Sequence, residues 1–440
     1  MNLTRKFAVA TLLLLLTACA TVPRPPQGLC HLGSYRLADG SLVDVGPSDG
    51  GLRWRRMDGL TGKLTSDRVG GWVNTTGWTD QPDPARVTFG ACGESRISFG
   101  GQLGQQAKLT VRETKFQGAD GTQLAGRLVL PAGEAPAPIT VIVHGSENTS
   151  ARLNYFQQRA WPAHGVGVFV YDKRGTGDSK GKYTQDFSVL ARDGAAAVAE
   201  ARRLAGSRAA RVGVEGGSQG SWIGPLVATL TPVDYVIALY GLAESPLAEN
   251  RGEVLQDLAD KGHGPDVLAK GGEVADITGK IMASNYRSGW DELAAIRKRY
   301  GREPWFKDLN GEFTGDFLRY PAPVLRVAGP FLSKGTTWNH DPVAVIRKVD
   351  APMLWVLAGQ DRDAPVEETR RRLVALAAED RRITVLEFPA TDHGMREFKI
   401  EDGERRYTRY ADGYYRAVLD FARDGKLSGD YADGTRLTRY

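Results

Sequence analysis

The sequence predicts an α/β fold, a mostly parallel sheet flanked by helices, with a helical lid insertion and a small all-β domain in front of it. From about residue 109 onward, near-continuously apolar strand segments alternate with helical segments, which is the pattern of a parallel sheet covered on both faces. Before that point, short runs of alternating polarity are separated by Gly-rich turns, and over residues 242–341 the strand–helix alternation breaks. We therefore expect two domains, the larger one interrupted.

Residues 1–18 are expected to be a lipoprotein signal peptide rather than part of the fold. Arg5 and Lys6 precede an apolar run over residues 7–16, which is too short to span a bilayer as a stable helix. The following Leu16-Thr17-Ala18-Cys19 is typical of a bacterial lipobox and predicts cleavage before Cys19 and lipidation of its thiol. Because Ala20 rather than Asp follows, we expect a cell-envelope protein anchored to the outer membrane and facing the periplasm. An ordinary secretory signal is the alternative.

A Pro-rich tether and a small β domain are expected over residues 19–108. Asp39-Gly40 and Asp58-Gly59 lie between runs of alternating polarity and indicate hairpins. Three tryptophans are predicted to fill the core of this barrel or sandwich rather than to form a ligand platform: Trp54, Trp72 and Trp78. No pattern in this domain indicates chemistry, so a spacer, a substrate-recognition module and a protein contact all remain open roles.

Cysteine usage is consistent with an oxidising compartment. Of the three cysteines, Cys19 takes the lipid, which leaves Cys30 and Cys92 inside the same small domain. We predict a Cys30–Cys92 disulfide, which would contribute about 4 kcal/mol to stability by restricting the unfolded chain. Two buried free thiols are the alternative.

The larger domain, residues 109–440, begins with a predicted hairpin over residues 111–131 around Asp120-Gly121. Strand candidates then follow at residues 139–144, 166–172, 211–215, 235–240, 353–357 and 384–388. Helix candidates are residues 187–205, 366–379 and 414–423. The carboxyl ends of parallel strands meet at one edge of a sheet, and functional groups gather there. The break at residues 242–341 is too long for a simple loop, so we expect it to form its own helices and to lie over this edge like a lid.

The strongest catalytic signal is Gly216-Gly217-Ser218-Gln219-Gly220, which follows a short apolar strand and precedes a helical segment. This is the pattern of a nucleophile elbow, in which a strained turn exposes the serine oxygen. Strand and helix approach so closely there that Gly216 and Gly220 are required. G-x-S-x-G occurs twice more, around Ser48 and Ser179, but neither serine has both a strand before it and a helix after it. Ser218 is therefore the candidate nucleophile.

A serine nucleophile needs a base to take its proton and a group that orients the base. His393 follows the last strand candidate, and two carboxylates, Asp361 and Asp363, follow the strand candidate at residues 353–357. Both carboxylates can reach past the strand end, so the residues alone leave the choice between them open. Either one gives the chain order Ser, Asp, His, which occurs in one class of serine hydrolases.

Over residues 109–425 the chain resembles the α/β-hydrolases, and within them the bacterial group of serine esterases and serine aminopeptidase-like enzymes. Five motifs in the family's order carry this resemblance: His144-Gly145-Ser146, the run from Tyr171 to Ser179, the Ser218 elbow, the Asp361 turn and Asp392-His393-Gly394. The resemblance implies a Ser218–His393–Asp361 triad, with the main-chain N–H groups of Gln219 and Ser146 as the oxyanion hole. The family's spacing, with the acid four residues before a proline, favours Asp361 over Asp363.

Two further expectations concern the surroundings of this triad. The charged run Asp172-Lys173-Arg174 is expected to brace loops rather than to touch substrate. Pro225 lies inside the helix expected after Ser218 and is a departure from the pattern, because it would bend or interrupt that helix. Residues 1–108 lie outside the resemblance.

Composition and spacing exclude several functions. The net charge is +5, and 57 lysines and arginines are scattered among 52 acidic residues, so no basic stripe indicates nucleic-acid binding. No cluster has metal-ligand spacing, and no Gly-rich loop is followed by a P-loop lysine and hydroxyl. We therefore expect neither a metal nor a cofactor.

The function expected from these observations is a serine hydrolase that cleaves carboxylic esters through an acyl-enzyme intermediate. An aminopeptidase or other serine peptidase is the first alternative, because the same triad serves amides. An aminopeptidase would need a carboxylate to meet the substrate ammonium, and the insertion offers Glu244, Glu253 and Asp257. The second alternative is a non-catalytic envelope protein whose β domain contacts a partner.

Overall fold

The computed structural model describes residues 28–67, 71–333, 335–379 and 382–438. The predicted signal peptide, Cys19 and the tether before residue 28 lie outside the described residues. Within these ranges, no helix combines the length and the apolar character that a membrane crossing requires.

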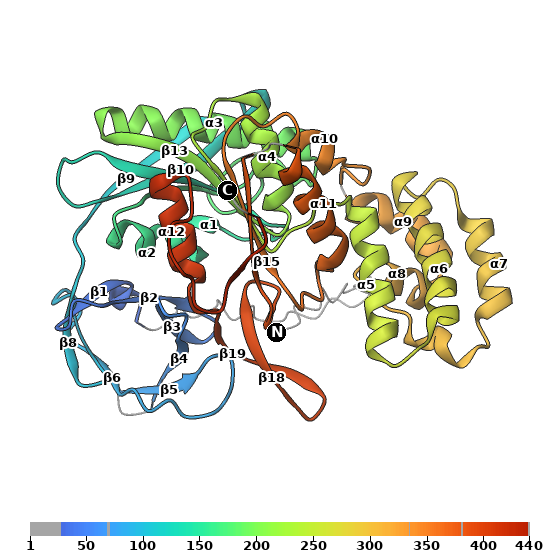
Figure 1. The fold of residues 1–440 in the computed structure, drawn as a ribbon, viewed down its shortest axis with the longest axis horizontal. Helices are drawn as coiled ribbons and strands as arrows, with labels where there is room; N and C mark the ends of the chain where they lie inside the picture. The colour runs from blue at the N-terminus through green and yellow to red at the C-terminus, as the bar shows by residue number, and fades with distance from the viewer. Residues whose placement is uncertain (1–27, 68–70, 334, 380–381, 439–440) are drawn as a thin grey trace, which may run out of the picture.

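Residues 33–106 form an eight-stranded antiparallel sheet that curls around its own core (Figure 1). Its strands are β1 (Gly33–Leu37), β2 (Leu42–Ser48), β3 (Gly51–Arg56), β4 (Thr61–Ser66), β5 (Trp72–Thr76), β6 (Val87–Phe89), β7 (Arg96–Phe99) and β8 (Gln102–Gln106). They follow the order β5-β4-β3-β2-β1-β8-β7-β6. Because side chains alternate along each strand, one face gathers buried Tyr35, Val43, Val45, Leu52 and Leu64.

The predicted disulfide is confirmed. Cys30 lies in the short 3-10 turn η1 (Leu29–His31) and is bonded to Cys92 in the turn between β6 and β7, with Cα atoms 5.5 Å apart. Because β6 and β7 form one edge of the sheet, the bond ties the start of the described chain to that edge.

The prediction that three tryptophans fill the core of this domain holds for Trp54 and is wrong for Trp78. Trp54 is 3% exposed inside the core, and Trp72 is half-buried at its rim. Trp78 comes after the end of β5, where Gly77 has a φ of 57° and turns the chain away from the sheet. As a result Trp78 packs against two tyrosines of the larger domain.

The larger domain is built on a nine-stranded sheet in the order β20-β16-β15-β14-β13-β11-β12-β10-β9. Its strands are β9 (Leu109–Gln117), β10 (Gln123–Pro131), β11 (Ala137–Val143), β12 (Gly167–Tyr171), β13 (Ala209–Gly217), β14 (Val236–Leu239), β15 (Met353–Ala358), β16 (Ile383–Phe388) and β20 (Thr435–Arg436). Neighbouring strands from β12 to β16 are parallel, and β9 and β10 form the predicted antiparallel hairpin. The mostly parallel α/β sheet is therefore confirmed, and its strand ends meet at one carboxyl edge.

Helices cover both faces of this sheet (Figure 1). One face carries α2 (Gln157–Ala163) and α12 (Tyr414–Asp424), which bury Trp161 and Phe421 against β12 and β14. The other face carries α3 (Phe187–Ala205), α4 (Gly220–Leu230) and α11 (Val366–Ala378). Pro225 lies inside α4, and the helix continues through it without interruption.

The insertion between β14 and β15 is helical, as expected. Its helices are α5 (Pro246–Asp260), α6 (Pro265–Ala283), α7 (Trp290–Tyr300), α8 (Thr314–Arg319) and α9 (Ala322–Leu332), after which α10 (Pro342–Ile346) returns the chain to the sheet. They enclose two small apolar cores of their own. In Figure 1 this unit extends sideways from the sheet, with α5 nearest to the main domain. Arg362, just past β15, lies 3.2 Å from Asp260 of α5, so α5 borders the carboxyl edge.

A short third sheet follows the last parallel strand, and the sequence reasoning did not include it. Its strands, in sheet order, are β17 (Thr391–Asp392), β18 (Arg396–Glu401) and β19 (Glu404–Tyr410). Figure 1 shows the β18–β19 hairpin extending below the main sheet, with β19 on the side next to the β domain. This hairpin begins three residues after His393 and connects the two domains.

Candidate active site

Ser218 stands in the sharp turn between β13 and α4. Its φ of 54° is a left-handed conformation that costs a non-glycine residue about 1–3 kcal/mol. Its main-chain N–H donates to the carbonyl of Leu239, at the end of β14, over 3.0 Å. A Cβ on Gly216 would lie 2.2 Å from the carbonyl oxygen of Gly220, and one on Gly220 would lie 2.7 Å from that of Val143. Both positions therefore have room for glycine alone, and the turn carries Ser218 to the carboxyl edge.

The three serines of the G-x-S-x-G pattern have different surroundings. Ser48 ends β2 in the β domain. Ser179 is buried, and its hydroxyl donates to the carbonyl of Asp172 over 2.5 Å and accepts from the Ala125 N–H over 2.9 Å. Within the described ranges, Ser218 Oγ has no hydrogen-bond partner. Of the serines in this pattern at the sheet, Ser218 is thus the one whose oxygen is not already engaged.

His393 and Asp361 form a hydrogen-bonded pair at the ends of β16 and β15. His393 Nδ1 lies 3.0 Å from Asp361 Oδ2, and Asp361 Oδ1 also accepts the N–H groups of Asp363 and Ala364 at 3.0 and 2.8 Å. Asp363 itself is exposed. Burial lowers the pKa of His393, but the charge of Asp361 and its hydrogen bond outweigh burial and raise the pKa to about 9. With Nδ1 engaged by Asp361, Nε2 is the ring atom left for a substrate or a serine.

Tyr240 lies between the elbow and the histidine. Its ring is edge-on to the His393 ring, with centroids 5.0 Å apart, and a Cβ on Gly217 would lie 2.3 Å from its hydroxyl oxygen. The structure thus brings Asp361 and His393 into direct contact, and Tyr240 contacts both His393 and the elbow. Among the described residues, no hydrogen bond joins Ser218 to His393. In unliganded enzymes this contact is often long and shortens when substrate binds.

The loop after β11 packs on the elbow and is fixed by several hydrogen bonds. A Cβ on Gly145 would lie 3.6 Å from the elbow's main chain. Lys173 Nζ donates to the carbonyl of Gly145 over 2.8 Å, and the Tyr183 hydroxyl donates to that of Ser146 over 2.5 Å. On the elbow side, the main-chain N–H of Gln219 donates to no other described residue. Ser146 and Gln219 are the two residues whose main-chain N–H groups are the candidates for the oxyanion hole.

The side chain of His144 holds the loop after β11 in place and is engaged on both of its ring nitrogens. The side chain is 2% exposed, with Nδ1 3.0 Å from Glu147 and Nε2 2.7 Å from the carbonyl oxygen of Tyr171. Burial raises the pKa of the Glu147 carboxyl, but the hydrogen bond and charge of His144 outweigh burial and lower it to about 2. The pair therefore locks the loop after β11 to the end of β12.

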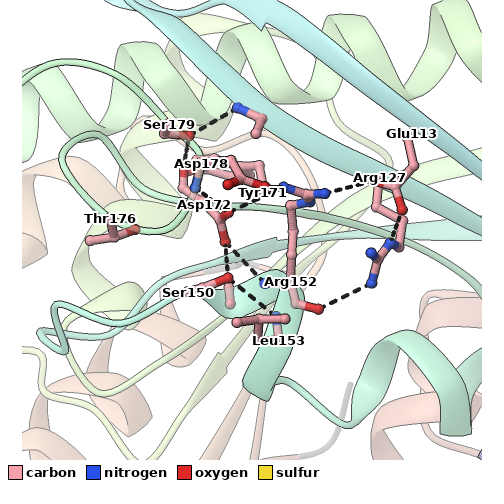
Figure 2. Close-up of polar contacts among 12 residues, drawn as sticks. Glu113, Arg127, Ser150, Arg152, Leu153, Tyr171, Asp172, Thr176, Asp178 and Ser179 are labelled. Atoms are coloured by element: carbon pink, nitrogen blue, oxygen red, sulfur yellow. Dashed lines mark hydrogen bonds and ion pairs between the residues drawn. The ribbon is translucent and has the colours of Figure 1, made fainter. Parts of the chain in front are cut away.

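The loop after β12 is held by the buried carboxylate of Asp172 (Figure 2). Its Oδ1 accepts from the Ser150 hydroxyl at 2.6 Å and from the N–H of Arg152, in the short helix α1 (Ala151–Asn154), at 3.1 Å. Its Oδ2 accepts from the Asp178 N–H at 3.1 Å. The Arg152 guanidinium extends the network to the carboxylates of Asp178 and Glu113, both at 2.8 Å. Asp172 thus braces these loops, which is the role that the sequence predicted for the run Asp172-Lys173-Arg174.

Carboxylates from the insertion gather close to the acid of the pair. Glu253 of α5 is buried, and its Oε2 accepts the N–H of Glu312 over 2.6 Å. Burial raises the pKa of Glu253 well above its usual range, and the charges of Glu312 and Asp363 raise it further. Half-buried Glu249 lies one turn earlier on α5, and its pKa is raised by burial first and then by Glu253. Glu249 and Glu312 were missed from the sequence, although Glu249 precedes Glu253 by the four residues that put both on one helix face.

Two other expectations, an ammonium partner at Glu244 and the lack of a metal site, concern residues whose positions the structure gives. Glu244, offered by the sequence as a possible ammonium partner, instead lies 3.8 Å from Arg372 of α11. Within the described part of the chain, one group of three potential metal ligands has its ligand atoms close together: Cys30, His31 and Cys92. Both thiols of that group are joined in the disulfide.

Comparisons with known proteins agree with this architecture. Residues 134–240, which include β11 to β14 and the elbow, match the family model described as serine aminopeptidase, S33. No curated protein matches the chain. Together with the strand order, this match gives the larger domain the α/β-hydrolase fold, which a separate β domain precedes.

Several solved structures are similar to the chain at low sequence identity. An esterase of Pyrococcus furiosus is 14% identical over 65% of this chain and 84% of its own, with a TM-score of 0.41. The acylaminoacyl peptidase of Pyrococcus horikoshii is 14% identical over 91% of this chain and 58% of its own, with a TM-score of 0.44. Brefeldin A esterase, a bacterial homologue of human hormone-sensitive lipase, is 15% identical over 66% of this chain and 70% of its own, with a TM-score of 0.40.

Proposed function

We propose that this protein is a hydrolase that cleaves carboxylic esters with Ser218 as nucleophile, His393 as general base and Asp361 as the group that orients the base. One observation carries the proposal. At the carboxyl edge of the sheet, a serine stands on a strained strand-to-helix turn, and Tyr240, which packs against that turn, contacts a histidine whose Nδ1 is hydrogen-bonded to a buried aspartate. In chain order these are Ser, Asp and His, which is the order of the α/β-hydrolases.

The reaction that this arrangement supports is covalent. His393 Nε2 takes the proton of Ser218 as Oγ attacks the ester carbonyl, and Asp361 stabilises the imidazolium that forms. The main-chain N–H groups of Gln219 and Ser146 receive the charge on the oxyanion, where one such donor contributes about 3 kcal/mol. His393 then gives its proton to the leaving alcohol. Water, deprotonated by His393, releases the acyl group from Ser218.

Two assays on the purified mature protein test this proposal. One is labelling by a fluorophosphonate, which reacts with activated serines, and the other is turnover of p-nitrophenyl esters from acetyl to longer chains. We expect wild type and Ser48→Ala to label and to hydrolyse esters, and Ser218→Ala to do neither. Ser48 is the matched control, because it has the same G-x-S-x-G spacing in the β domain. A folded wild-type protein that never labels would instead favour a non-catalytic binding protein in the cell envelope.

A peptidase acting on free N-termini is a second candidate, supported by the carboxylates beside Asp361. An ammonium group next to Glu249, Glu253 and Glu312 would relieve the mutual repulsion of these acids. Aminoacyl-p-nitroanilides measured beside the esters separate the two functions. Faster anilide turnover that falls in Glu253→Gln, and not in Glu244→Gln, would assign the chain to the aminopeptidases. Glu244 is the control because it lies by Arg372 instead.

The location that we propose is the outer membrane, with the chain facing the periplasm and anchored by a lipid on Cys19. The lipobox before Cys19 and the Cys30–Cys92 disulfide, which needs an oxidising compartment, support it. Labelling of cells with a radioactive fatty acid tests it. We expect label in wild type and none in Cys19→Ser, which should appear in the soluble periplasmic fraction.

A further inference from the structure

We propose that the N-terminal β domain is a positioning element for His393, acting through Trp78 and the β18–β19 hairpin. The inference rests on the proposed function, in which His393 is the general base. It gives a role to a domain in which no sequence pattern indicates chemistry. Three sets of contacts lead from that domain to the histidine.

The first set joins the two domains through their main chains. The Trp78 N–H donates to the carbonyl of Tyr407, and the Tyr410 N–H donates to the carbonyl of Gly59, both over 2.9 Å. A Cβ on Gly59 would lie 2.1 Å from the Tyr410 carbonyl oxygen, and one on Gly77 would lie 2.3 Å from that of Thr408. Both glycines also have positive φ. The β domain thus holds β19 by direct main-chain pairing that leaves no room for a side chain.

The second set is a cluster of aromatic rings and guanidinium groups around Trp78. The indole is edge-on to Tyr410, with ring centroids 5.1 Å apart, and to Tyr407 at 6.4 Å. The Arg53 guanidinium lies 4.4 Å from the Trp78 ring centre. Arg396 of β18 lies 5.8 Å from the same ring and 4.2 Å from that of Tyr407. Cations at these distances are attracted to the ring faces, so Trp78 draws Arg396 and β19 together.

The third set runs from the hairpin to the histidine. Arg396 Nε donates to the carbonyl of His393 over 2.9 Å. On the other side, the buried carboxylate of Asp392 accepts the His393 N–H at 2.8 Å and the Tyr407 hydroxyl at 2.6 Å. Both main-chain polar groups of His393 are therefore bonded to residues that the hairpin holds in place.

The same carboxylate also fixes the acid of the pair. Asp392 Oδ1 accepts the N–H of Arg362, the residue after Asp361, at 3.1 Å. Arg405 of β19 lies 2.8 Å from Asp392 Oδ2 and donates to the carbonyl of Gln360 over 2.6 Å. Burial raises the pKa of Asp392, but the hydrogen bonds from Tyr407 and Arg405 outweigh it and keep the pKa below its usual value. One charged group therefore sets the distance between acid and base.

A catalytic base needs this precision, because a displacement of about 1 Å at a reacting group can lower the rate about 10²-fold. The hairpin is short, charged and mostly exposed at its tip, so it has little core of its own. We infer that it keeps its place because it pairs with Gly59 and packs on Trp78. Loss of the Trp78 ring should let the turn that carries His393 move, while Ser218 and the residues that bind substrate keep their positions.

The experiment compares Trp78→Ala with Trp72→Ala in the full-length protein. Trp72 is the matched control, a tryptophan of the same domain that packs on its core and not on the hairpin. We expect kcat for a p-nitrophenyl ester to fall about 10-fold or more in Trp78→Ala, with KM nearly unchanged. Trp72→Ala should match wild type, and Trp78→Phe, which keeps an aromatic ring, should recover part of the loss. Circular dichroism establishes that each variant is folded.

A second readout does not depend on activity: the pKa of the His393 imidazole, followed by NMR. The charged groups that face this ring are Asp361, Asp363 and Arg396, and the Tyr240 ring packs on it. We expect the pKa to move from about 9 toward its ordinary value in Trp78→Ala, because the ring shifts from Asp361. Tyr407→Phe, which removes the bond to Asp392 and keeps the ring, should shift it in the same direction and serves if Trp78→Ala does not fold.

Each outcome decides the proposal. A kcat and a His393 pKa in Trp78→Ala equal to those of Trp72→Ala would overturn it, even if the protein is an esterase. If wild type neither labels with the fluorophosphonate nor turns over ester, the proposed function fails, and the NMR shift alone then decides whether the β domain positions His393.

Discussion

Ser218 and Ser179 share the same five-residue pattern, and both lie in loops at the same sheet, but their surroundings are opposite. Ser179 is buried with its hydroxyl bonded on both sides, inside the network around Asp172. Ser218 has a strained φ of 54° and an oxygen without a partner among the described residues. Under the proposed function, the difference means that the backbone on either side of the motif decides which serine is exposed for reaction. A strand must enter and a helix must leave for the serine to be presented, and the loop around Ser179 instead stabilises the edge.

The largest effect is expected from removing the Ser218 hydroxyl. Ser218→Ala should lower kcat for ester hydrolysis about 10⁶-fold, as loss of the nucleophile does in other triads, and leave the unfolding midpoint nearly unchanged. Relief of the positive φ cannot occur, because alanine is strained there too. Steady-state kinetics and thermal unfolding on one preparation measure both. A residual rate above 1% of wild type would assign the chemistry to another group.

The next effect tests the orientation of the base. Asp361→Asn should lower kcat about 10⁴-fold, because the amide cannot stabilise the imidazolium or hold its tautomer. His393 must be neutral to accept a proton, so kcat/KM in wild type should rise with pH and level off near its pKa of about 9. In Asp361→Asn the raising charge is gone, and the profile should level off at a lower pH. Asp363→Asn is the control, because Asp363 is exposed and does not bond to His393. A larger loss in Asp363→Asn than in Asp361→Asn would reverse the assignment.

Substitution of a residue that only stabilises the fold should lower the free energy of unfolding and leave kcat unchanged. Cys92→Ser removes the disulfide, whose loop spans 62 residues, and should lower the free energy of unfolding of the β domain by about 4 kcal/mol. Its folded fraction should keep the wild-type kcat at low temperature, because neither cysteine takes part in the contacts between Gly59 or Trp78 and the β18–β19 hairpin. Urea unfolding followed by tryptophan fluorescence reports the change. Equal stability with and without the bond would contradict it.

The smallest effect is expected at the second serine. Ser179→Ala leaves the Ala125 N–H without its acceptor and should cost about 1–3 kcal/mol of stability. Its kcat should stay within a few-fold of wild type. Ser179→Ala therefore lowers stability and keeps the rate, whereas Ser218→Ala lowers the rate and keeps stability. Urea unfolding and ester kinetics of the two variants, measured side by side, make the comparison. A Ser179→Ala protein that is stable but inactive would place Ser179 in the chemistry.

The sheet, its hairpin at Asp120-Gly121 and helix α3 could be predicted because each depends on local periodicity and turn chemistry. The candidate triad could be located for a related reason: each residue comes within a few positions of the end of a strand, and strand ends meet at one edge. The residues alone left the choice between Asp361 and Asp363 open, because it depends on which carboxylate faces His393, and only the spacing of the family that the chain resembles favoured Asp361.

Other features depend on contacts between distant parts of the chain. Trp78 looked like a core residue because its sequence neighbours are strand-like, but its partners, Tyr407 and Tyr410, lie near the other end of the chain. The sequence had one local signal for the β18–β19 hairpin, the pair Asp402-Gly403, which forms its turn with φ of 53° and 76°. The two strands lack the alternation of apolar residues by which a strand is predicted. The carboxylate group around Glu253 likewise forms only when α5 and Glu312 come together.

Peptide mapping of the fluorophosphonate adduct tests the central claim most directly, because it distinguishes all three G-x-S-x-G serines in one measurement. After labelling of the folded protein, proteolysis and mass spectrometry should find the adduct on the peptide that contains Ser218. The peptides that contain Ser48 and Ser179 should be unmodified. An adduct on either of those, or on a serine away from the elbow while Ser218 stays unmodified, would contradict the account.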